Sequence, residues 1–185
     1  LMILNEAFSG ATSFNQPLSH WNVSKVTDFE KMFLNAESFN QDLGSWDMRS
    51  ATTVREMFLS AVSFNQDLGA WQLNKLVSSN EKMLFNSGMD CRNYSSTLLG
   101  WSKNDNLSTG VDLDSVNLEY SENAKRARNV LIKQKNWTVT GDQESQNCDF
   151  CNFEASAIRL TSDNCETACD GEAAVLTLNG EAPYT

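Results

Sequence analysis

The stretch SFNQDLGSW, residues 38–46, returns as SFNQDLGAW at 63–71 and in a looser form as SFNQPLSHW at 13–21. The copies define a period of 25 residues, which three sets of apolar positions keep: Phe8, Phe33 and Phe58; Phe14, Phe39 and Phe64; Trp21, Trp46 and Trp71. Self-similarity at such a period is typical of proteins built from stacked repeats. One repeat carries too few large apolar side chains to offset the entropy lost on ordering it, so stacking on neighbours is expected.

Each repeat contains two periodic segments. The segment after the first Trp, WNVSKV at 21–26, alternates apolar and polar residues and predicts a half-buried strand. The segment FEKMFLNA at 29–36 has apolar residues at helical spacing and predicts a short helix. The expected fold is therefore an α/β repeat solenoid, leucine-rich-repeat-like, with one parallel sheet and short helices.

Amide side chains also keep the period. Asn15, Asn40 and Asn65 fall in register, and so do Gln16, Gln41 and Gln66. Stacked amides can hydrogen-bond from one repeat to the next and satisfy backbone groups at the corners. We therefore interpret them as part of the frame, in preference to ligand contacts.

The repeat pattern ends in a predicted cap. A degenerate fourth turn runs to Trp101, thirty residues after Trp71. The segment 120–137 then predicts an amphipathic helix with Ser121 as N-cap, and WTVTGD at 137–142 predicts a short strand. We assign residues 1–142 to the solenoid, with the cap starting at about residue 80.

Composition changes near residue 147. Residues 148–185 carry seven acidic side chains and one basic side chain, and four of the five cysteines. The four are Cys148, Cys151, Cys165 and Cys169. Clustered cysteines in an acidic, Thr-rich segment favour disulfides of an exported protein, and a zinc site with four thiolates is the alternative. Four cysteines allow three pairings. We assign 143–152 to a linker.

The repeat MFLNAESFNQDLGSWDMRSATTVREMF at 32–58 resembles the BspA-like leucine-rich-repeat surface proteins of bacteria, and the segments 89–101 and 127–142 are similar to the end of such arrays. The resemblance covers residues 1 to about 142 and implies an extracellular location on the bacterial cell surface. Related caps often place a second cysteine where this chain has Ser121, which implies that Cys91 is an unpaired buried thiol.

Residues 153–185 are similar to the opening of the SprB-type immunoglobulin-like repeat of type IX-secreted, gliding-type adhesins, through DNCETACDGEAAVLTLNGEAPYT at 163–185. This implies the first strands of a β-sandwich, a bridge between Cys165 and Cys169, and a second local bridge between Cys148 and Cys151. DSV at 114–116 resembles the O-glycosylation motif of these surface proteins, which makes Ser115 a glycosylation candidate.

The sequence offers no catalytic, cofactor-binding or metal-binding constellation. His20 is the only histidine, and a phosphate-binding loop is absent. Asp42 and Asp67 stack in register without matching a calcium loop. A net charge of −10 disfavours nucleic acid, and no stretch is long enough for membrane insertion. We therefore expect no enzyme and no cofactor.

The remaining expectation is that the repeats bind a ligand. Outward positions of the predicted strands differ between copies, as a binding face on a fixed frame should. These ligand-face candidates are Asn22, Ser24, Asp47, Arg49, Gln72 and Asn74. We expect a non-enzymatic adhesin segment that binds a host or environmental surface protein or a polysaccharide. The alternative is a structural spacer or stalk segment of a giant gliding-type filament, in contact with neighbouring modules of the same long chain.

Overall fold

A computed structural model describes residues 2–77, 81–145 and 147–148. The chain divides into two compact units, residues 1–148 and 149–185. The predicted immunoglobulin-like module at 153–185, and with it Cys151, Cys165 and Cys169, lies outside the described residues. The description below is of the first unit.

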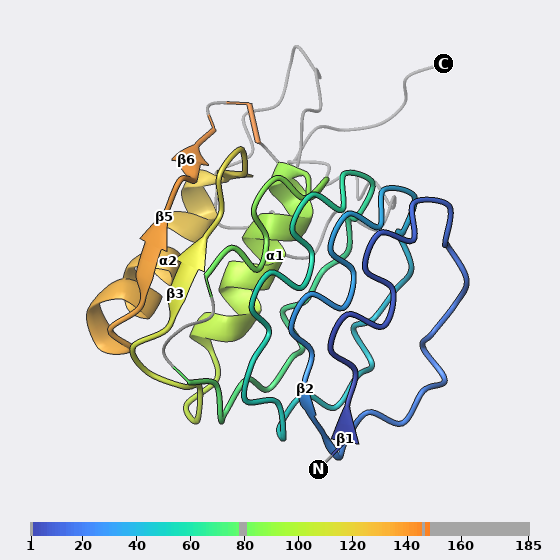
Figure 1. Ribbon diagram of the computed structural model, residues 1–185. Helices are drawn as coiled ribbons and strands as arrows, with labels where there is room; N and C mark the ends of the chain where they lie inside the picture. Colours follow the sequence, from blue (N-terminus) through green and yellow to red (C-terminus); the bar gives the residue numbers. More distant parts are fainter. Residues whose placement is uncertain (1, 78–80, 146, 149–185) are drawn as a thin grey trace, which may run out of the picture. The chain divides into compact units, whose positions relative to one another are not determined.

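Three repeats lie side by side at the start of this unit, as the blue to green loops in Figure 1. The first (2–25) opens with strand β1, Met2–Ile3, and the second (26–50) opens with strand β2, Val26–Asp28. The two strands pair in parallel, and an isolated parallel bridge from Asp28 to Thr53 reaches the third repeat (51–75). Parallel pairing at this spacing brings equivalent residues of successive repeats next to one another.

The helix predicted at 29–36 is a run of turns. The N–H groups of Met32 and Leu34 donate to carbonyls three residues earlier within the repeat. The N–H groups of Lys31 and Phe33, in contrast, donate to carbonyls of the third repeat. The backbone thus alternates between bonds inside a repeat and bonds between repeats, which an α-helix does not allow.

Residues with positive φ make these turns. Lys31 and Asn35 occupy the left-handed region, and the same conformation recurs 25 residues earlier and later and once more after 26: Glu6 and Gly10, Glu56 and Ser60, Lys82 and Asn86. A positive φ at the third position is the mark of a type II turn. Glu and Lys rarely adopt a positive φ, so the side-chain pattern does not predict these turns.

The strand predicted at 21–26 is also displaced. A turn closed by the Val26 N–H and the Val23 carbonyl, 2.8 Å apart, occupies most of this segment. The strand begins only at Val26, where β2 starts. The ligand-face candidates therefore lie on a corner and not along a sheet.

Columns of aromatic rings form the core, as the repeat predicts. Rings at equivalent positions stack at centroid distances of 5.5 to 6.1 Å in two columns: Phe8, Phe33 and Phe58, and Phe14, Phe39 and Phe64. The indole N–H of Trp46 donates to the Leu18 carbonyl of the repeat before, at 3.0 Å. Trp71 repeats this bond at 2.9 Å, so the buried N–H groups are satisfied by the stack itself.

Two helices follow the repeats. Helix α1, Cys91–Ser102, begins after the N-cap Asp90 and packs against α2, Glu122–Gln134. The sequence predicts α2 and its N-cap Ser121, and both predictions are confirmed. Helix α1 is not predicted above, although its buried residues Tyr94, Leu98 and Trp101 lie at helical spacing.

Short parallel strand pairs accompany these helices. Strand β3, Asp112–Asp114, pairs with β5, Thr138–Thr140, and β4, Glu119–Tyr120, pairs with β6, Gln143–Glu144. Strand β5 confirms the strand predicted from WTVTGD. The linker predicted at 143–152 differs from the structure, because β6 lies within it and the first unit extends to Cys148.

Candidate functional site

An amide ladder runs along one corner of the stack, as predicted. The Oδ1 atom of Asn15 accepts the backbone N–H of Asn40 at 2.9 Å, and Asn40 accepts that of Asn65 in the same way. Asp90 continues the series, because its N–H donates to Asn65 Oδ1 at 2.9 Å. Each amide thus satisfies a backbone donor of the next repeat, which makes it part of the frame.

A second corner carries the predicted ligand-face candidates, which we call the corner row: Asn22, Ser24, Asp47, Arg49, Gln72 and Asn74. In the first repeat the Asn22 Oδ1 atom accepts both the N–H and the hydroxyl of Ser24, at 3.2 and 2.7 Å. In the second, Asp47 Oδ1 accepts the Arg49 N–H at 3.1 Å. Both are Asx turns, so the first member of each pair also shapes the corner.

Charge distinguishes the second repeat of the corner row. The Arg49 guanidinium lies 2.6 Å from Asp47 Oδ2, and its side chain is 66% exposed. Its hydrogen bond is the main cause that lowers the pKa of the Asp47 carboxyl to about 2, and the same bond raises the pKa of Arg49. The pair therefore stays ionised at neutral pH and presents a fixed guanidinium to solvent.

The third repeat presents amides at this corner. Gln72 is exposed. Its backbone carbonyl accepts the Asn74 N–H at 3.0 Å, so the longer side chain of Gln72 does not form the Asx turn seen in the other two repeats. Asn74 Oδ1 accepts from Asn104 at 3.0 Å. The corner row thus brings neutral polar, charged and amide groups into one register of the stack.

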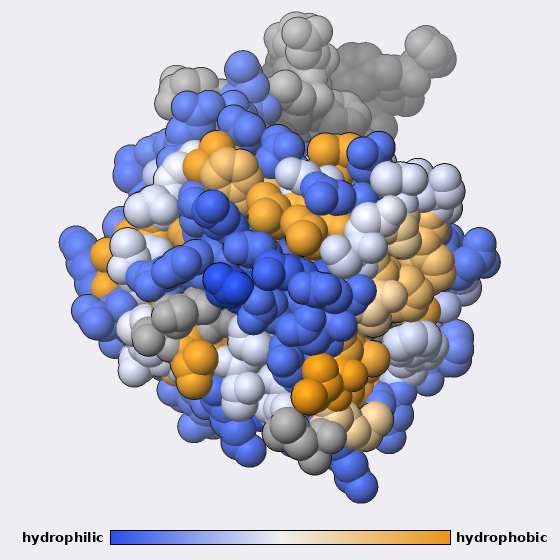
Figure 2. Space-filling model, viewed as in Figure 1, coloured by the Kyte–Doolittle hydropathy of each residue, from blue (hydrophilic) through white to orange (hydrophobic). Residues whose placement is uncertain are grey.

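Figure 2 shows one face of the molecule, on which hydrophilic side chains run across the middle between apolar patches. Among the described residues, four large apolar side chains are at least half exposed: Met2, Ile3, Val62 and Val77. Within the described residues no group of three or more His, Cys, Asp or Glu side chains is placed to hold a metal ion. No described helix is long and apolar enough to cross a membrane.

A buried charge cluster lies between α1, α2 and the turn after β5. Arg128 binds Asp142 through two bonds of 2.7 and 2.8 Å, and the Asp142 side chain is completely buried. The Tyr94 hydroxyl donates to the same carboxylate at 3.0 Å. Burial, followed by the nearby Asp142 charge, raises the pKa of Tyr94 well above its usual value. We interpret this cluster as a structural contact that stabilises the cap, since the Asp142 carboxylate is not accessible to solvent.

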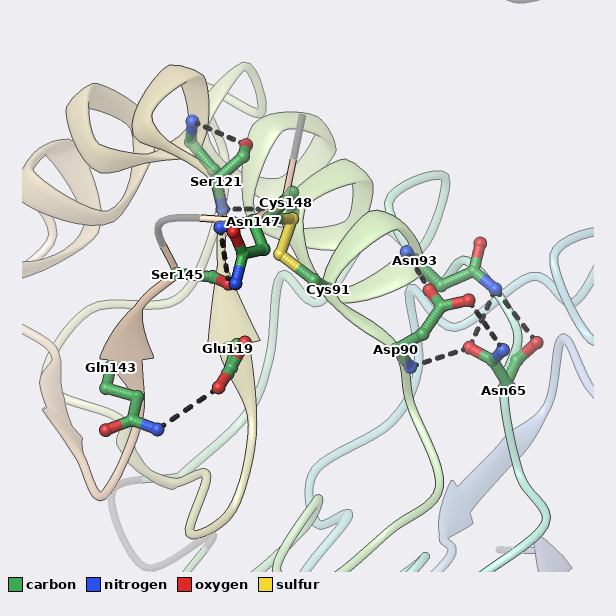
Figure 3. Close-up of a disulfide and its surroundings, with 12 residues drawn as sticks. Asn65, Asp90, Cys91, Asn93, Glu119, Ser121, Gln143, Ser145, Asn147 and Cys148 are labelled. Carbon is green, nitrogen blue, oxygen red and sulfur yellow. Dashed lines mark hydrogen bonds between the residues drawn. A yellow bond between two sulfur atoms is a disulfide. The ribbon is translucent and has the colours of Figure 1, made fainter. Parts of the chain in front are cut away.

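The disulfide of the first unit joins Cys91 to Cys148, with Cα atoms 5.8 Å apart (Figure 3). The expectation that Cys91 is a free thiol is therefore wrong, and so is the local bridge between Cys148 and Cys151. The bond connects the start of α1 to the end of the first unit, which a separation of 57 residues conceals in the sequence.

Four other residues singled out from the sequence have defined positions. Ser115 is fully buried, so its hydroxyl is not available to a glycan in the folded unit, and the glycosylation expected there does not fit the structure. His20 is exposed, next to Trp21 at the corner. Asp42 accepts the Gly44 N–H at 2.7 Å, and Asp67 does the same for Gly69, so both acids shape turns.

Residues 1–97 match the model of a family described as "Mycoplasma protein of unknown function, DUF285". The match covers the three repeats and most of the fourth turn up to the first half of α1. No curated protein and no solved structure matches the chain.

Proposed function

The chain belongs to the DUF285 family, and from its stacked repeats we propose that it is a non-enzymatic segment of an exported bacterial surface adhesin. In this proposal the stack is a leucine-rich-repeat-like solenoid, with turns in place of the expected short helices, and it supports the corner row. The corner row binds a surface protein or a polysaccharide of the host or environment. The disulfide between Cys91 and Cys148 supports export, because such bonds persist in oxidising compartments.

One observation carries the binding role. The groups that hold successive repeats together recur at 25-residue spacing, whereas the solvent-facing groups of the corner row change in each repeat. Arg49 offers an exposed guanidinium in a fixed orientation, and Gln72 offers an exposed amide. Such groups donate hydrogen bonds to sugar hydroxyls, carbonyls and carboxylates.

The test is binding of the purified 185-residue chain to glycan arrays and to immobilised extracellular-matrix proteins. The variant Arg49→Ala/Gln72→Ala removes solvent-facing groups that no repeat-to-repeat bond uses. Asp47→Asn keeps the Oδ1 acceptor of the Asx turn and removes the charge. Binding should fall at least about tenfold in the double variant, since two hydrogen bonds with a charged or polar group are lost.

A matched control uses another exposed column at the same spacing, Thr12, Glu37 and Val62. Changing these three to alanine should leave binding unchanged. If the control variant loses binding and the Arg49 and Gln72 variant does not, the corner row is not the ligand face.

The position of the disulfide favours a second candidate, a structural spacer in a long filament. The bond closes the first unit at its last residue, directly before the second unit begins. A spacer needs a stable junction and no ligand. Absence of binding on all surfaces, together with stiff, end-to-end arrays of the longer polypeptide in electron micrographs, would favour the spacer over the adhesin.

A further inference from the structure

Each of the three repeats places one cation on the turn that forms the corner. In the first repeat this turn runs from Val23 to Val26, and Lys25 is one of its two central residues. Arg49 lies in the equivalent turn of the second repeat, and Lys75 has the position in the third repeat that Lys25 has in the first. All three cations are exposed. A solvent-facing positive charge therefore recurs from repeat to repeat along this corner.

A fourth cation follows the third repeat. Lys103 is exposed and directly precedes Asn104, whose Nδ2 group donates to Asn74 Oδ1 in the third corner turn at 3.0 Å. Asn104 Oδ1 also accepts the Asn106 N–H at 3.0 Å, which is an Asx turn like those of the first two repeats. The corner thus continues past residue 75 with the same local geometry. We call its four cations the basic strip: Lys25, Arg49, Lys75 and Lys103.

The three lysines of the basic strip have no side-chain partner among the described residues. The described ion pairs and hydrogen bonds leave out the ammonium groups of Lys25, Lys75 and Lys103. The chain has 24 acidic and 14 basic side chains, so acids to pair with are abundant. Three exposed lysines without an acidic partner, all at one corner, make this corner unlike the rest of the acidic chain.

Two acids lie in or next to the corner turns, and both are already in contact with a cation. Asp47 pairs with Arg49 at 2.6 Å. The backbone carbonyl of Asp105 accepts the ammonium group of Lys135 at 2.8 Å, which brings a fifth cation beside the Asp105 side chain. These acids therefore do not neutralise the basic strip, and the corner stays locally positive.

The spacing of the stack keeps these cations near one another. Parallel pairing of successive repeats holds their backbones about 4.8 Å apart where the strands meet. Like charges at equivalent positions of neighbouring strands repel each other. Anionic groups placed along the strip would remove this repulsion, so the arrangement is suited to a negatively charged ligand.

The shape of the strip and its neighbours favour a linear, hydroxylated ligand. The cations follow one another in single file, which fits an extended polymer better than a flat bilayer surface. Asn22 and Gln72 add exposed amides beside them, and amides bond to sugar hydroxyls. Nucleic acid is disfavoured, because the chain as a whole carries a net charge of −10.

We propose that the basic strip binds an anionic polysaccharide, one whose sugars carry carboxylate or sulfate groups. The ammonium groups of Lys25, Lys75 and Lys103 bind the anionic oxygens, and the amides of Asn22 and Gln72 bind sugar hydroxyls between them. This inference rests on the proposed binding role of the corner row. It names the ligand class and adds three lysines to the binding surface.

The experiment measures binding of the purified 185-residue chain to three polymers that share one backbone: carboxymethyl dextran, dextran sulfate and unmodified dextran. The parent should bind at least one charged polymer at low salt, more weakly at high salt, and at least about tenfold more tightly than dextran. Comparison of the two charged polymers separates carboxylate from sulfate recognition. The variant Lys25→Gln/Lys75→Gln/Lys103→Gln should bind that polymer at least about tenfold more weakly, because three charge-assisted contacts are lost.

The matched control is Lys82→Gln/Arg126→Gln/Lys133→Gln. These three cations are also exposed but lie away from the corner, and their replacement changes the net charge by the same amount. The control should bind the charged polymer as the parent does. Circular dichroism checks that both triple variants keep the parent fold, as expected for exposed side chains.

Four outcomes overturn the proposal. Dextran is bound as tightly as its charged derivatives; the corner variant binds like the parent; the control loses as much affinity as the corner variant; or poly-glutamate is bound as tightly as carboxymethyl dextran, which would make an acidic protein the ligand. Binding of matrix proteins or neutral glycans through Arg49 and Gln72, with neither charged dextran bound, would disprove this inference and leave the proposed function intact. A chain that binds none of these surfaces would disprove both.

Discussion

Gly100 of α1 lies against the backbone of Gly69 in the third repeat, so closely that a Cβ at residue 100 would overlap the Gly69 Cα, carbonyl carbon and oxygen. This contact joins the first helix to the repeats. Glycine at both positions lets two backbones approach in a way that no other residue permits.

We expect Gly100→Ala to destabilise the first unit. Alanine is the better helix former by about 1 kcal/mol, but overpacking against a backbone costs typically 1–3 kcal/mol and more where the neighbour cannot move. The free energy of unfolding, measured by urea titration, should therefore fall. The control is Gly44→Ala, whose Cβ would meet its nearest neighbour, Asp42 Oδ1, at 3.1 Å and the next at 3.7 Å. A Gly100→Ala protein as stable as the parent would disprove the contact.

The amide ladder should have a measurable energy. Asn40→Ala removes the acceptor for the Asn65 N–H and for the Gln66 side chain, which lies 2.7 Å away. Because both bonds are exposed and water can replace the lost acceptor, the loss should be about 0.5–1.5 kcal/mol in urea titrations. Asn40→Asp keeps the oxygen acceptor and should cost less. Gln16→Ala, which removes an exposed amide of the same register with no bond to a described residue, should be neutral, and equal losses in all three would contradict the ladder.

The disulfide should stabilise the cap. In the chain-entropy description, closing a loop across the 57 positions between Cys91 and Cys148 contributes roughly 4 kcal/mol. Cys91→Ser and Cys148→Ser should therefore lower the melting temperature by the same amount, and reduction of the parent should match them. Peptide mapping should recover the linked pair. Serine at Cys151, Cys165 and Cys169 is the control, and a larger loss there would locate the main bridge elsewhere.

Alkaline pH should weaken the buried charge cluster. The folded-state pKa of Tyr94 is raised, first by burial and then by Asp142. A raised pKa gives stability that is complete below the unfolded value of 10 and is lost as the pH rises above it. The urea midpoint of the parent should thus fall between pH 9 and about pH 11, as unfolded tyrosine ionises. The urea midpoint of Tyr94→Phe should already be lower than that of the parent at pH 9, because a hydrogen bond is missing. If this midpoint fell with pH as steeply as in the parent, the assignment would be contradicted.

The corner pair should respond to acid. The Asp47 pKa is lowered from 3.8 to about 2, mainly by its hydrogen bond with Arg49. A lowered pKa gives stability that is present above 3.8 and is lost as the pH falls toward 2. NMR titration of the Asp47 carboxyl should give a value near 2 in the parent and one close to 3.8 in Arg49→Ala. Salt should reduce the difference, because the pair is largely exposed.

The sequence predicts the features that recur in side chains. The 25-residue step of Phe33 and Trp46 predicts the aromatic columns, the register of Asn40 predicts the amide ladder, and Ser121 predicts the start of α2. These predictions hold because each depends on a residue type whose local physics is specific.

Features that depend on backbone conformation or on distant pairing escape sequence reasoning. The turns at 29–36 share the helical spacing of apolar residues, but the positive φ of Lys31 and Asn35 and the hydrogen bonds to the next repeat distinguish them from a helix. For the corner row, the sequence identifies Asp47 and Arg49 as outward residues but not their mutual pairing. Helices α1 and α2 lie between Cys91 and Cys148 in the sequence, and no local pattern indicates that these two cysteines pair.

The bond between Cys91 and Cys148 also sets how the molecule carries tension. Cys148 ends the first unit, so a pull that enters from residue 149 passes through the sulfur atoms into the start of α1. Helix α2 and strands β3 to β6 lie outside this load path. While the disulfide is intact, the segment between the two cysteines cannot be extended. Its 57 positions, at about 3.5 Å each, correspond to roughly 200 Å of contour length, which becomes available only when the bond is reduced. The cap is thus an inextensible end, and stretching falls on the repeats that precede it.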